Sequence, residues 1–84
     1  LAASGDAQPD AQARLREIES ALGAALERLS PEHREILILR EIQGMDYDAI
    51  AATLRCRKGT VRSRLARARE QLRQQMLAMG GDLL

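Results

Sequence analysis

The sequence predicts an all-α domain of four helices, in which the last two form a helix-turn-helix without a wing. Apolar residues recur at intervals of three and four, which is the spacing of one helix face. Most of them are Leu, Ile, Ala and Met, and runs of β-branched residues are few. The 84 residues suffice for one small domain with a thin core.

The ends of the chain have the composition of connecting segments. Residues 1–9 are small and polar and include Gly and Pro, so we expect a linker there. The domain is expected to span residues 10–79. Gly80 and Gly81 end the last helix, and residues 80–84 are expected to form a flexible tail.

The first helix is expected to begin at Pro9 and Asp10, because Pro suits the first turn and Asp interacts favourably with the helix dipole. Its predicted core face consists of Leu15, Ile18, Leu22, Ala25 and Leu29. Over so few turns, this pattern favours a core face over a coiled coil. Gly23 weakens the helix by about 1 kcal/mol relative to Ala, and the close approach of a neighbouring helix would account for it.

The second helix has the clearest start signal in the chain. Ser30 is the expected N-cap, and Pro31 and an acidic residue follow in the first turn. The helix is expected to continue to Ile42. Gly44 is expected to end it by adopting a left-handed conformation. Its apolar arc is wider than packing on one neighbour requires. His33 has no partner that would make it a catalytic base.

The third helix is expected at Tyr47–Leu54, with Asp46 accepting hydrogen bonds from the unpaired N–H groups of the first turn. A short break follows. Arg55 stands where many helix-turn-helix sequences use Gly for positive φ, which costs about 1 kcal/mol. Arg57 is a poor N-cap for the next helix. Cys56, the single cysteine, predicts a buried structural thiol and excludes an internal disulfide.

The fourth helix is expected to run from about Lys58 to Met76. A narrow apolar stripe along it consists of Val61, Leu65, Ala68 and Leu72. Mostly small residues form the opposite side: Gly59, Ser63, Ala66 and Glu70. The flanking arginines are Arg62, Arg69 and Arg73 on one edge, with Arg64 and Arg67 on the other. Met76 and Met79 extend the apolar edge, either as a frayed end or as a partner surface.

Charge is divided unevenly along the chain, although the formal net charge is only +1. Residues 1–50 hold five arginines and ten acids, a net charge of −5. Residues 51–84 hold eight bases and two acids, a net charge of +6. Such segregation indicates a face for a polyanion, with binding that depends steeply on salt.

A helix with small residues between arginines suits duplex DNA. An α-helix fits the major groove, and the planar guanidinium fork matches phosphate or the edge of guanine. The simpler alternative is a basic helix face that is only solvated. DNA binding is favoured over it because this helix follows another helix at the spacing of a helix-turn-helix. Single-stranded nucleic acid is disfavoured, because the chain has one aromatic residue on which bases could stack.

Other functional classes have little support. No nucleophile–base pair, phosphate loop or metal cluster stands out, so we expect no enzyme, no metal and no cofactor. The sequence contains no run of about twenty apolar residues, the length that a membrane-spanning helix needs, so we expect no membrane insertion of this chain.

The run from Leu29 through Arg73 resembles region 4 of a bacterial RNA polymerase sigma factor, most closely the extracytoplasmic-function (ECF, group 4) class. Its landmarks are Leu29-Ser30-Pro31, Leu39-Arg40-Glu41, Gly44, Tyr47, Ile50-Ala51, Gly59-Thr60-Val61-Arg62-Ser63-Arg64 and Arg67-Ala68-Arg69. The resemblance implies a four-helix domain that reads the −35 element of double-stranded promoter DNA. It also implies docking on the β-subunit flap of the polymerase core, a regulating anti-sigma factor, and a bacterial cytoplasmic location. Region 2 of such factors is missing from this chain.

Site residues follow from the same resemblance. By position, Arg62, Ser63 and Ala66 would face bases. The other expected DNA-binding residues, near the backbone, are Arg57, Lys58, Thr60, Arg64, Arg67 and Arg69. The wide apolar arc of the second helix would be a groove for a partner helix, at Ile36, Leu37 and Ile38. Arg55 and Arg57 depart from the Gly and the Pro or Ser that are commoner in the family.

Two alternatives stay open at this point. A stand-alone or response-regulator-type helix-turn-helix regulator shows a similar Ile-Ala and Thr-Val spacing, but it would dimerise on palindromic sites. A helical protein-interaction domain would use the arginines only for solubility.

Overall fold

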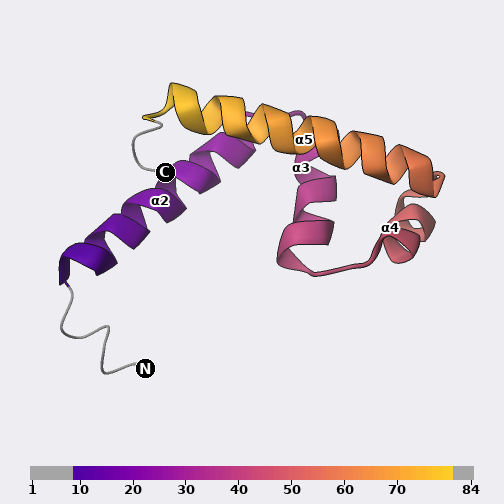
Figure 1. The fold of residues 1–84 in the computed structure, drawn as a ribbon, viewed down its shortest axis with the longest axis horizontal. Helices are drawn as coiled ribbons and strands as arrows, with labels where there is room; N and C mark the ends of the chain where they lie inside the picture. The colour runs from indigo at the N-terminus through magenta and orange to yellow at the C-terminus, as the bar shows by residue number, and fades with distance from the viewer. Residues whose placement is uncertain (1–8, 81–84) are drawn as a thin grey trace.

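The computed structural model describes residues 9–80 and is all-α over that range (Figure 1). Its elements are α2 (Pro9–Glu27), α3 (Pro31–Leu37), the π-helix η1 (Ile38–Ile42), α4 (Tyr47–Leu54) and α5 (Lys58–Ala78). The predicted four α-helices are therefore present, and α4 and α5 form the predicted helix-turn-helix. No helix among the described residues has the length and apolar character needed to cross a membrane.

The predicted linker and tail fall almost wholly outside the described residues. Pro9, which we assigned to the linker, is the first residue of α2. Gly80, which we assigned to the tail, follows the end of α5 with a positive φ of 107°. Residues 1–8 and 81–84 lie outside the part of the chain that the structure describes.

The long helix α5 is the element on which the others pack. In Figure 1, α3 and α4 lie below its N-terminal half, while α2 rises from the lower left to meet its C-terminal half, also from below. The molecule is elongated as a result, with principal extents of 47 × 30 × 15 Å. The N-terminal half of α5 is thus supported by two helices and the C-terminal half by one.

Two apolar clusters hold this arrangement together. The main cluster joins α3, α4 and α5, and its largest fully buried side chains are Ile36, Ile50, Val61 and Leu65. The predicted stripe of α5 is confirmed, since Val61, Leu65 and Ala68 are buried. A smaller cluster joins α2 to α5 through Ala21, Ala25 and Met76.

The predicted helix boundaries rest on local hydrogen bonds that the structure contains. The Ser30 Oγ accepts from the His33 N–H at 3.3 Å, and the Asp46 Oδ1 accepts from the Ala49 N–H at 2.7 Å. Gly44 has a φ of 71° and ends the second helical segment in the predicted left-handed region. Since each signal lies within three residues of the group it caps, local sequence sufficed to locate these ends.

The second helical segment contains a π-helix that the sequence did not predict. From Ile38 to Ile42 the chain is wider than an α-helix, and the Gln43 N–H donates to the Ile38 carbonyl at 2.9 Å. A π turn inserts one residue into the helical repeat. Within this segment Ile42 is exposed, and Glu41 forms an ion pair with Arg69 of α5.

The predicted core face of the first helix is correct only in part. Leu15 and Leu22 are 60% and 38% exposed, whereas Ala21 and Ala25 are buried. Small residues allow α2 to approach α5, and Leu22, next to Ala21, is left partly exposed. The expectation for Gly23 is wrong, because a Cβ there would have no heavy atom within 4 Å.

The end of α5 also differs from both sequence-based expectations. Met76 is neither frayed nor a partner surface, because its side chain is buried against α2. Met79 is half-buried beside the same cluster. The helix extends to Ala78, two residues beyond the predicted end, since α2 gives this last turn a surface on which to pack.

Candidate nucleic-acid interface

The outward side of α5 is the surface on which the predicted DNA-binding residues meet. Ser63 and Ala66 are exposed, while Val61 and Leu65 on the opposite side are buried. Gly59 is exposed too, and a Cβ there would have no heavy atom within 4 Å. The helix therefore presents small side chains to solvent along its first two turns.

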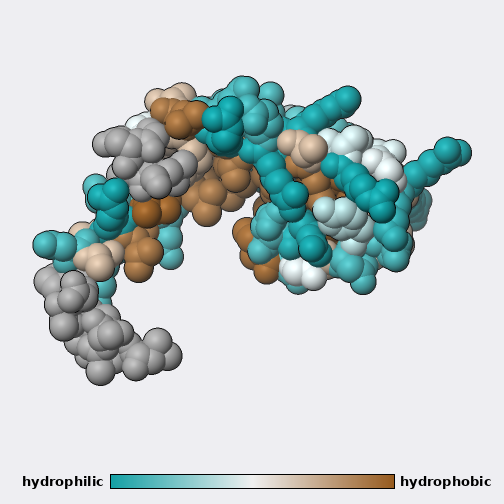
Figure 2. Space-filling view, in the orientation of Figure 1, coloured by the Kyte–Doolittle hydropathy of each residue, from teal (hydrophilic) through white to brown (hydrophobic). Residues whose placement is uncertain are grey.

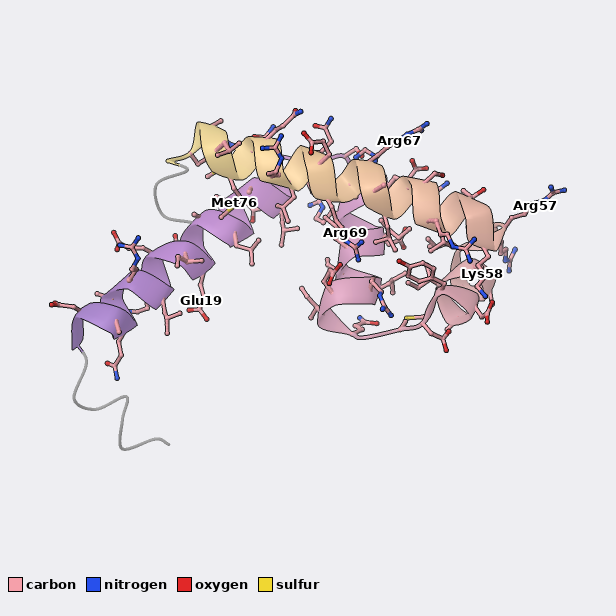
Figure 3. All side chains as sticks on the ribbon, in the orientation of Figure 1. Glu19, Arg57, Lys58, Arg67, Arg69 and Met76 are labelled. Atoms are coloured by element: carbon pink, nitrogen blue, oxygen red, sulfur yellow. The ribbon has the colours of Figure 1, made fainter. Side chains whose placement is uncertain are left out.

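Three arginines beside this side of α5 are exposed: Arg57, Arg62 and Arg67. None of them forms a salt bridge or side-chain hydrogen bond with another residue of the described range 9–80. Figure 3 shows Arg57 and Arg67 extending away from the domain. These three guanidinium groups are available to an external anion without the loss of an internal partner.

Three other bases of α5 are held by acids from earlier elements. Lys58 Nζ lies 3.1 Å from Asp48 of α4, and Arg64 Nη2 lies 3.7 Å from Glu32 of α3. The Nε and Nη2 atoms of Arg69 donate to Glu41 of η1 at 2.9 and 2.6 Å. The hydrogen bonds to Glu41 raise the pKa of Arg69 above its ordinary value.

The outward side of α5 changes character toward its C-terminal half. Glu70 lies there and accepts hydrogen bonds from Arg73 at 3.1 and 2.7 Å and from Gln74 at 3.1 Å. These donors, Arg73 first, lower the pKa of Glu70 below its usual range, and the same pair raises the pKa of Arg73. Between positions 57 and 67 the chain holds five bases and no acid. Two of these bases, Lys58 and Arg64, are paired with acids of other elements, so the unbalanced positive charge at this end of α5 comes from the three remaining arginines.

Two hydroxyl residues lie within this basic stretch. The Ser63 Oγ donates to the Thr60 carbonyl at 3.2 Å, which orients the hydroxyl along the helix and leaves its oxygen lone pairs free to accept. Thr60 itself is half-buried. Ser63 is thus better placed than Thr60 to meet a ligand that approaches the outward side.

Comparison with protein families identifies the arrangement. Residues 19–72 match the family model described as sigma-70, region 4. The chain belongs to the sigma-70 region 4 family. The match covers the end of α2, all of α3, η1 and α4, and the basic half of α5. This family is not a class of enzymes.

Curated relatives of the region 4 domain are sigma factors. Over 52 residues it is 52% identical to the ECF RNA polymerase sigma factor SigE of Mycolicibacterium smegmatis, covering 62% of this chain and 20% of the relative. Over 68 residues it is 41% identical to the RNA polymerase sigma-H factor of Pseudomonas aeruginosa, covering 80% and 35%. Over 56 residues it is 41% identical to the ECF RNA polymerase sigma-E factor of Escherichia coli K12, covering 67% and 29%. The chain thus spans between a fifth and about a third of the length of these relatives.

The expected partner residues of the region 4 domain occupy different surroundings. Ile36 and Leu37 are buried in the main cluster, and only Ile38 is partly presented to solvent. The wide apolar arc is therefore used mostly by the domain's own core, because both α4 and α5 pack on it. Sequence periodicity could not separate these two uses of an apolar face.

A small apolar hollow lies beside Ile38, below α5. Its lining residues are Leu22, Leu26, Leu37, Ile38, Glu41, Ile42 and Leu72. Figure 2 shows apolar side chains on both sides of the concave region below α5. Leu22, an exposed leucine of α2, and Ile42, an exposed isoleucine of η1, belong to this hollow, and the sequence pattern did not indicate either as a surface residue.

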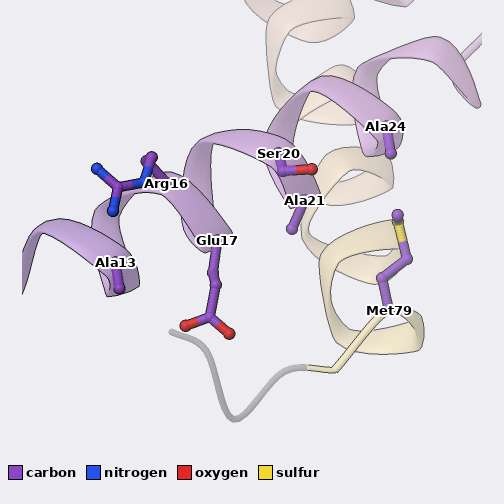
Figure 4. A pocket seen from close by; sticks show the side chains of 7 residues that line it. All are labelled: Ala13, Arg16, Glu17, Ser20, Ala21, Ala24 and Met79. Carbon is purple, nitrogen blue, oxygen red and sulfur yellow. The ribbon is translucent and has the colours of Figure 1, made fainter. Parts of the chain in front are cut away.

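Three further features of the described part of the region 4 domain concern metal ligands, an open hollow and the single thiol. Among those residues, no group of three or more His, Cys, Asp or Glu could hold a metal ion. An open hollow between α2 and Met79 brings together one arginine, one glutamate and one serine with small residues (Figure 4). Cys56 is a free thiol packed against the main cluster, but it is half-buried, and so less buried than the sequence predicted.

Proposed function

We propose that this region 4 domain recognises the −35 element of promoter DNA as part of an ECF-type sigma factor that directs RNA polymerase core enzyme to specific promoters. The observation that carries the proposal is the outward side of α5. Exposed Ser63 and Ala66 lie between Arg62 and Arg67, whose guanidinium groups have no partner among the described residues. The family and the ECF sigma factors among its relatives support the same function.

We infer different tasks for these side chains from their positions on the helix. An α-helix enters the major groove with its N-terminal residues first, and small residues let its axis approach the base edges. Arg62, Ser63 and Ala66 would then meet bases. Arg57 and Arg67 extend from the flanks of the helix and would bind phosphate, where guanidinium forks bind well.

Three other bases expected to bind DNA would each lose an ion pair within the domain on contact with phosphate. Lys58, Arg64 and Arg69 each have an acidic partner within the domain. For any of them, a phosphate contact would have to replace an existing ion pair. We therefore assign the main share of DNA affinity to the arginines without such partners.

The polymerase and an inhibitor would use the other side of the domain. An apolar hollow of the kind formed by Leu22, Leu26 and Ile42 accepts the apolar face of a helix. We propose the flap of the polymerase β subunit as its occupant during transcription, in the bacterial cytoplasm. An anti-sigma factor that covers this hollow, or the outward side of α5, would block initiation.

A selection from random duplexes tests DNA recognition with the 84-residue chain. One asymmetric motif should be enriched. Arg62→Ala should cost about 1–3 kcal/mol at particular base pairs and relax the preference there. Arg67→Ala should weaken all sequences evenly and reduce the salt slope by about 1. Arg16→Ala on α2 is the matched control and should change neither.

Other results would favour the alternatives. A tight symmetric dimer on inverted half-sites, without affinity for the isolated polymerase flap, would point to a stand-alone regulator. Equal binding by the wild-type chain, Arg62→Ala and Arg67→Ala would point to a protein-interaction domain whose arginines serve only solubility.

A further inference from the structure

One of the three ion pairs between α5 and the earlier elements is closer than the others. The Nε and Nη2 atoms of Arg69 both donate to Oε2 of Glu41, at 2.9 and 2.6 Å. The Arg64–Glu32 distance is 3.7 Å, too long for a hydrogen bond. Lys58 reaches Asp48 at 3.1 Å, but the Asp48 side chain is 78% exposed. The guanidinium of Arg69 is therefore the most firmly held of these three cations.

Glu41 belongs to the π-helix η1. From this position it reaches a residue 28 positions later on α5. Tyr47, the first residue of α4, contributes to the electrostatic environment of Arg69. Arg69 therefore points from α5 toward η1 and α4, although about half of its side chain is exposed (Figure 3).

Arg69 also has the spacing of a DNA contact. It follows Arg62 by seven residues, which is nearly two helical turns, so the two lie on one edge of α5 about 10 Å apart. Arg62 is exposed and has no partner among the described residues, whereas Arg69 is half exposed and paired. The same edge therefore carries one available and one occupied guanidinium.

We propose that Glu41 is an intramolecular competitor of DNA phosphate, which holds Arg69 against the domain so that this arginine does not contribute to DNA binding. The inference rests on the proposed function and extends it, because it makes Glu41 the residue that limits the domain's affinity for any duplex. A phosphate contact by Arg69 would add affinity without sequence information. Its suppression leaves binding dependent on the outward side of α5.

The test uses the 84-residue chain, the duplex enriched by selection and a random-sequence duplex of equal length. Glu41→Gln removes the competitor. It should tighten binding to both duplexes by a similar factor and steepen the salt slope by about 0.9, the contribution of one additional phosphate. The loss of affinity between about 50 and about 200 mM salt should then become about 3.5-fold larger than for the wild-type chain.

A double variant in which both side chains are neutral distinguishes this proposal from a direct contact between Arg69 and DNA phosphate in the wild-type complex. In Glu41→Gln/Arg69→Gln, both charges are gone and the net charge is unchanged. The double variant should match the wild-type salt slope and affinity, because Arg69 contributes nothing in the wild-type complex. A salt slope reduced by about 0.9 in the double variant would show that Arg69 leaves Glu41 and binds phosphate, which would overturn the proposal.

Glu35→Gln controls for the loss of one negative charge. Glu35 is exposed on α3 and has no ion pair with another described residue. If Glu41→Gln steepens the salt slope no more than Glu35→Gln does, the effect is general electrostatics and the proposal fails. The midpoint of thermal unfolding should be nearly unchanged in all variants, since exposed ion pairs contribute little to stability. A wild-type chain that binds no duplex would instead refute the proposed function.

Discussion

The guanidinium of Arg40 lies over the ring of Tyr47, with its Cζ atom 5.1 Å from the ring centroid. The same side chain donates from Nη1 to the Met45 carbonyl at 2.7 Å. Because Arg40 belongs to η1 and Tyr47 begins α4, the two contacts close the loop that contains Gly44. This loop sets the direction of α4, and α4 in turn supports the basic half of α5.

Loss of the Arg40 contacts should therefore destabilise the domain. Arg40→Met keeps most of the apolar stem but removes the cation–π interaction and the hydrogen bond. The free energy of unfolding should fall by about 1–2 kcal/mol, measured by urea denaturation. Arg28→Met, at an exposed arginine after α2, should change it by less than about 0.5 kcal/mol. Equal losses in the two variants would contradict the role given to Arg40.

The turn between α4 and α5 stores strain at Arg55, whose φ is 56° and ψ is 48°. Arg55→Gly should raise the free energy of unfolding by about 1 kcal/mol, because Gly adopts this left-handed conformation without a Cβ clash. Arg55→Ala is the matched control: it removes the same side chain but keeps the clash, so no gain is expected. A similar gain for Ala would assign the effect to the charge of Arg55 instead.

Sequence alone located the parts of the fold that depend on short-range interactions. The caps at Ser30 and Asp46 and the left-handed positions at Gly44 and Arg55 were all predictable, because each involves groups a few residues apart. The π-helix was not, since it depends on packing between elements. Leu15 was assigned to the core because periodicity identifies an apolar face but not whether another helix covers it.

The candidate site divides in the same way. The outward position of Ser63 follows from helical spacing against the buried stripe that includes Val61. The pairing of Arg69 could not be predicted in this way, because its partner Glu41 lies 28 residues away, in a π-helix that no sequence pattern indicated. The sequence thus identified the basic helix as a whole, and the structure was needed to separate its paired bases from its unpaired ones.

Gly23 offers a stabilising substitution. A Cβ at this exposed, helical position would meet nothing within 4 Å, so Gly23→Ala should raise the free energy of unfolding by about 0.5–1 kcal/mol. Gly44 also has open space around it, but its φ is 71°. Gly44→Ala should therefore lower the free energy of unfolding by about 1 kcal/mol. Thermal or urea denaturation of the two variants measures both changes in the free energy of unfolding. An increase in both variants would contradict the explanation from backbone conformation.

Met76 is the main contact by which α5 holds α2. It is buried against Ala21 and Ala25, and the second cluster is small, so Met76→Ala should cost about 2 kcal/mol. Amide hydrogen exchange should accelerate most in α2 and least around Ile50 in the main cluster. Leu77→Ala, at an exposed position one residue later, is the control and should leave exchange in α2 nearly unchanged. Uniform acceleration through all helices would show that the two clusters unfold as one unit.

Glu70 should titrate below the ordinary glutamate pKa, because Arg73 and Gln74 donate hydrogen bonds to its carboxylate. Because the folded-state pKa is depressed, this interaction stabilises the domain fully above the unfolded-state pKa of about 4.3, and the stabilisation is lost as the pH falls from there through the lower folded-state pKa. An NMR titration of the Glu70 carboxyl carbon measures the midpoint directly.

Arg73→Leu should raise that midpoint toward the value of a free glutamate. Added salt should do the same to a smaller degree, since the pair is exposed. Arg57→Leu, at the other end of α5, should leave it unchanged. A midpoint that ignores the loss of Arg73 would mean that the pair does not persist in solution, and that the C-terminal half of the helix carries more free positive charge than its hydrogen bonds indicate.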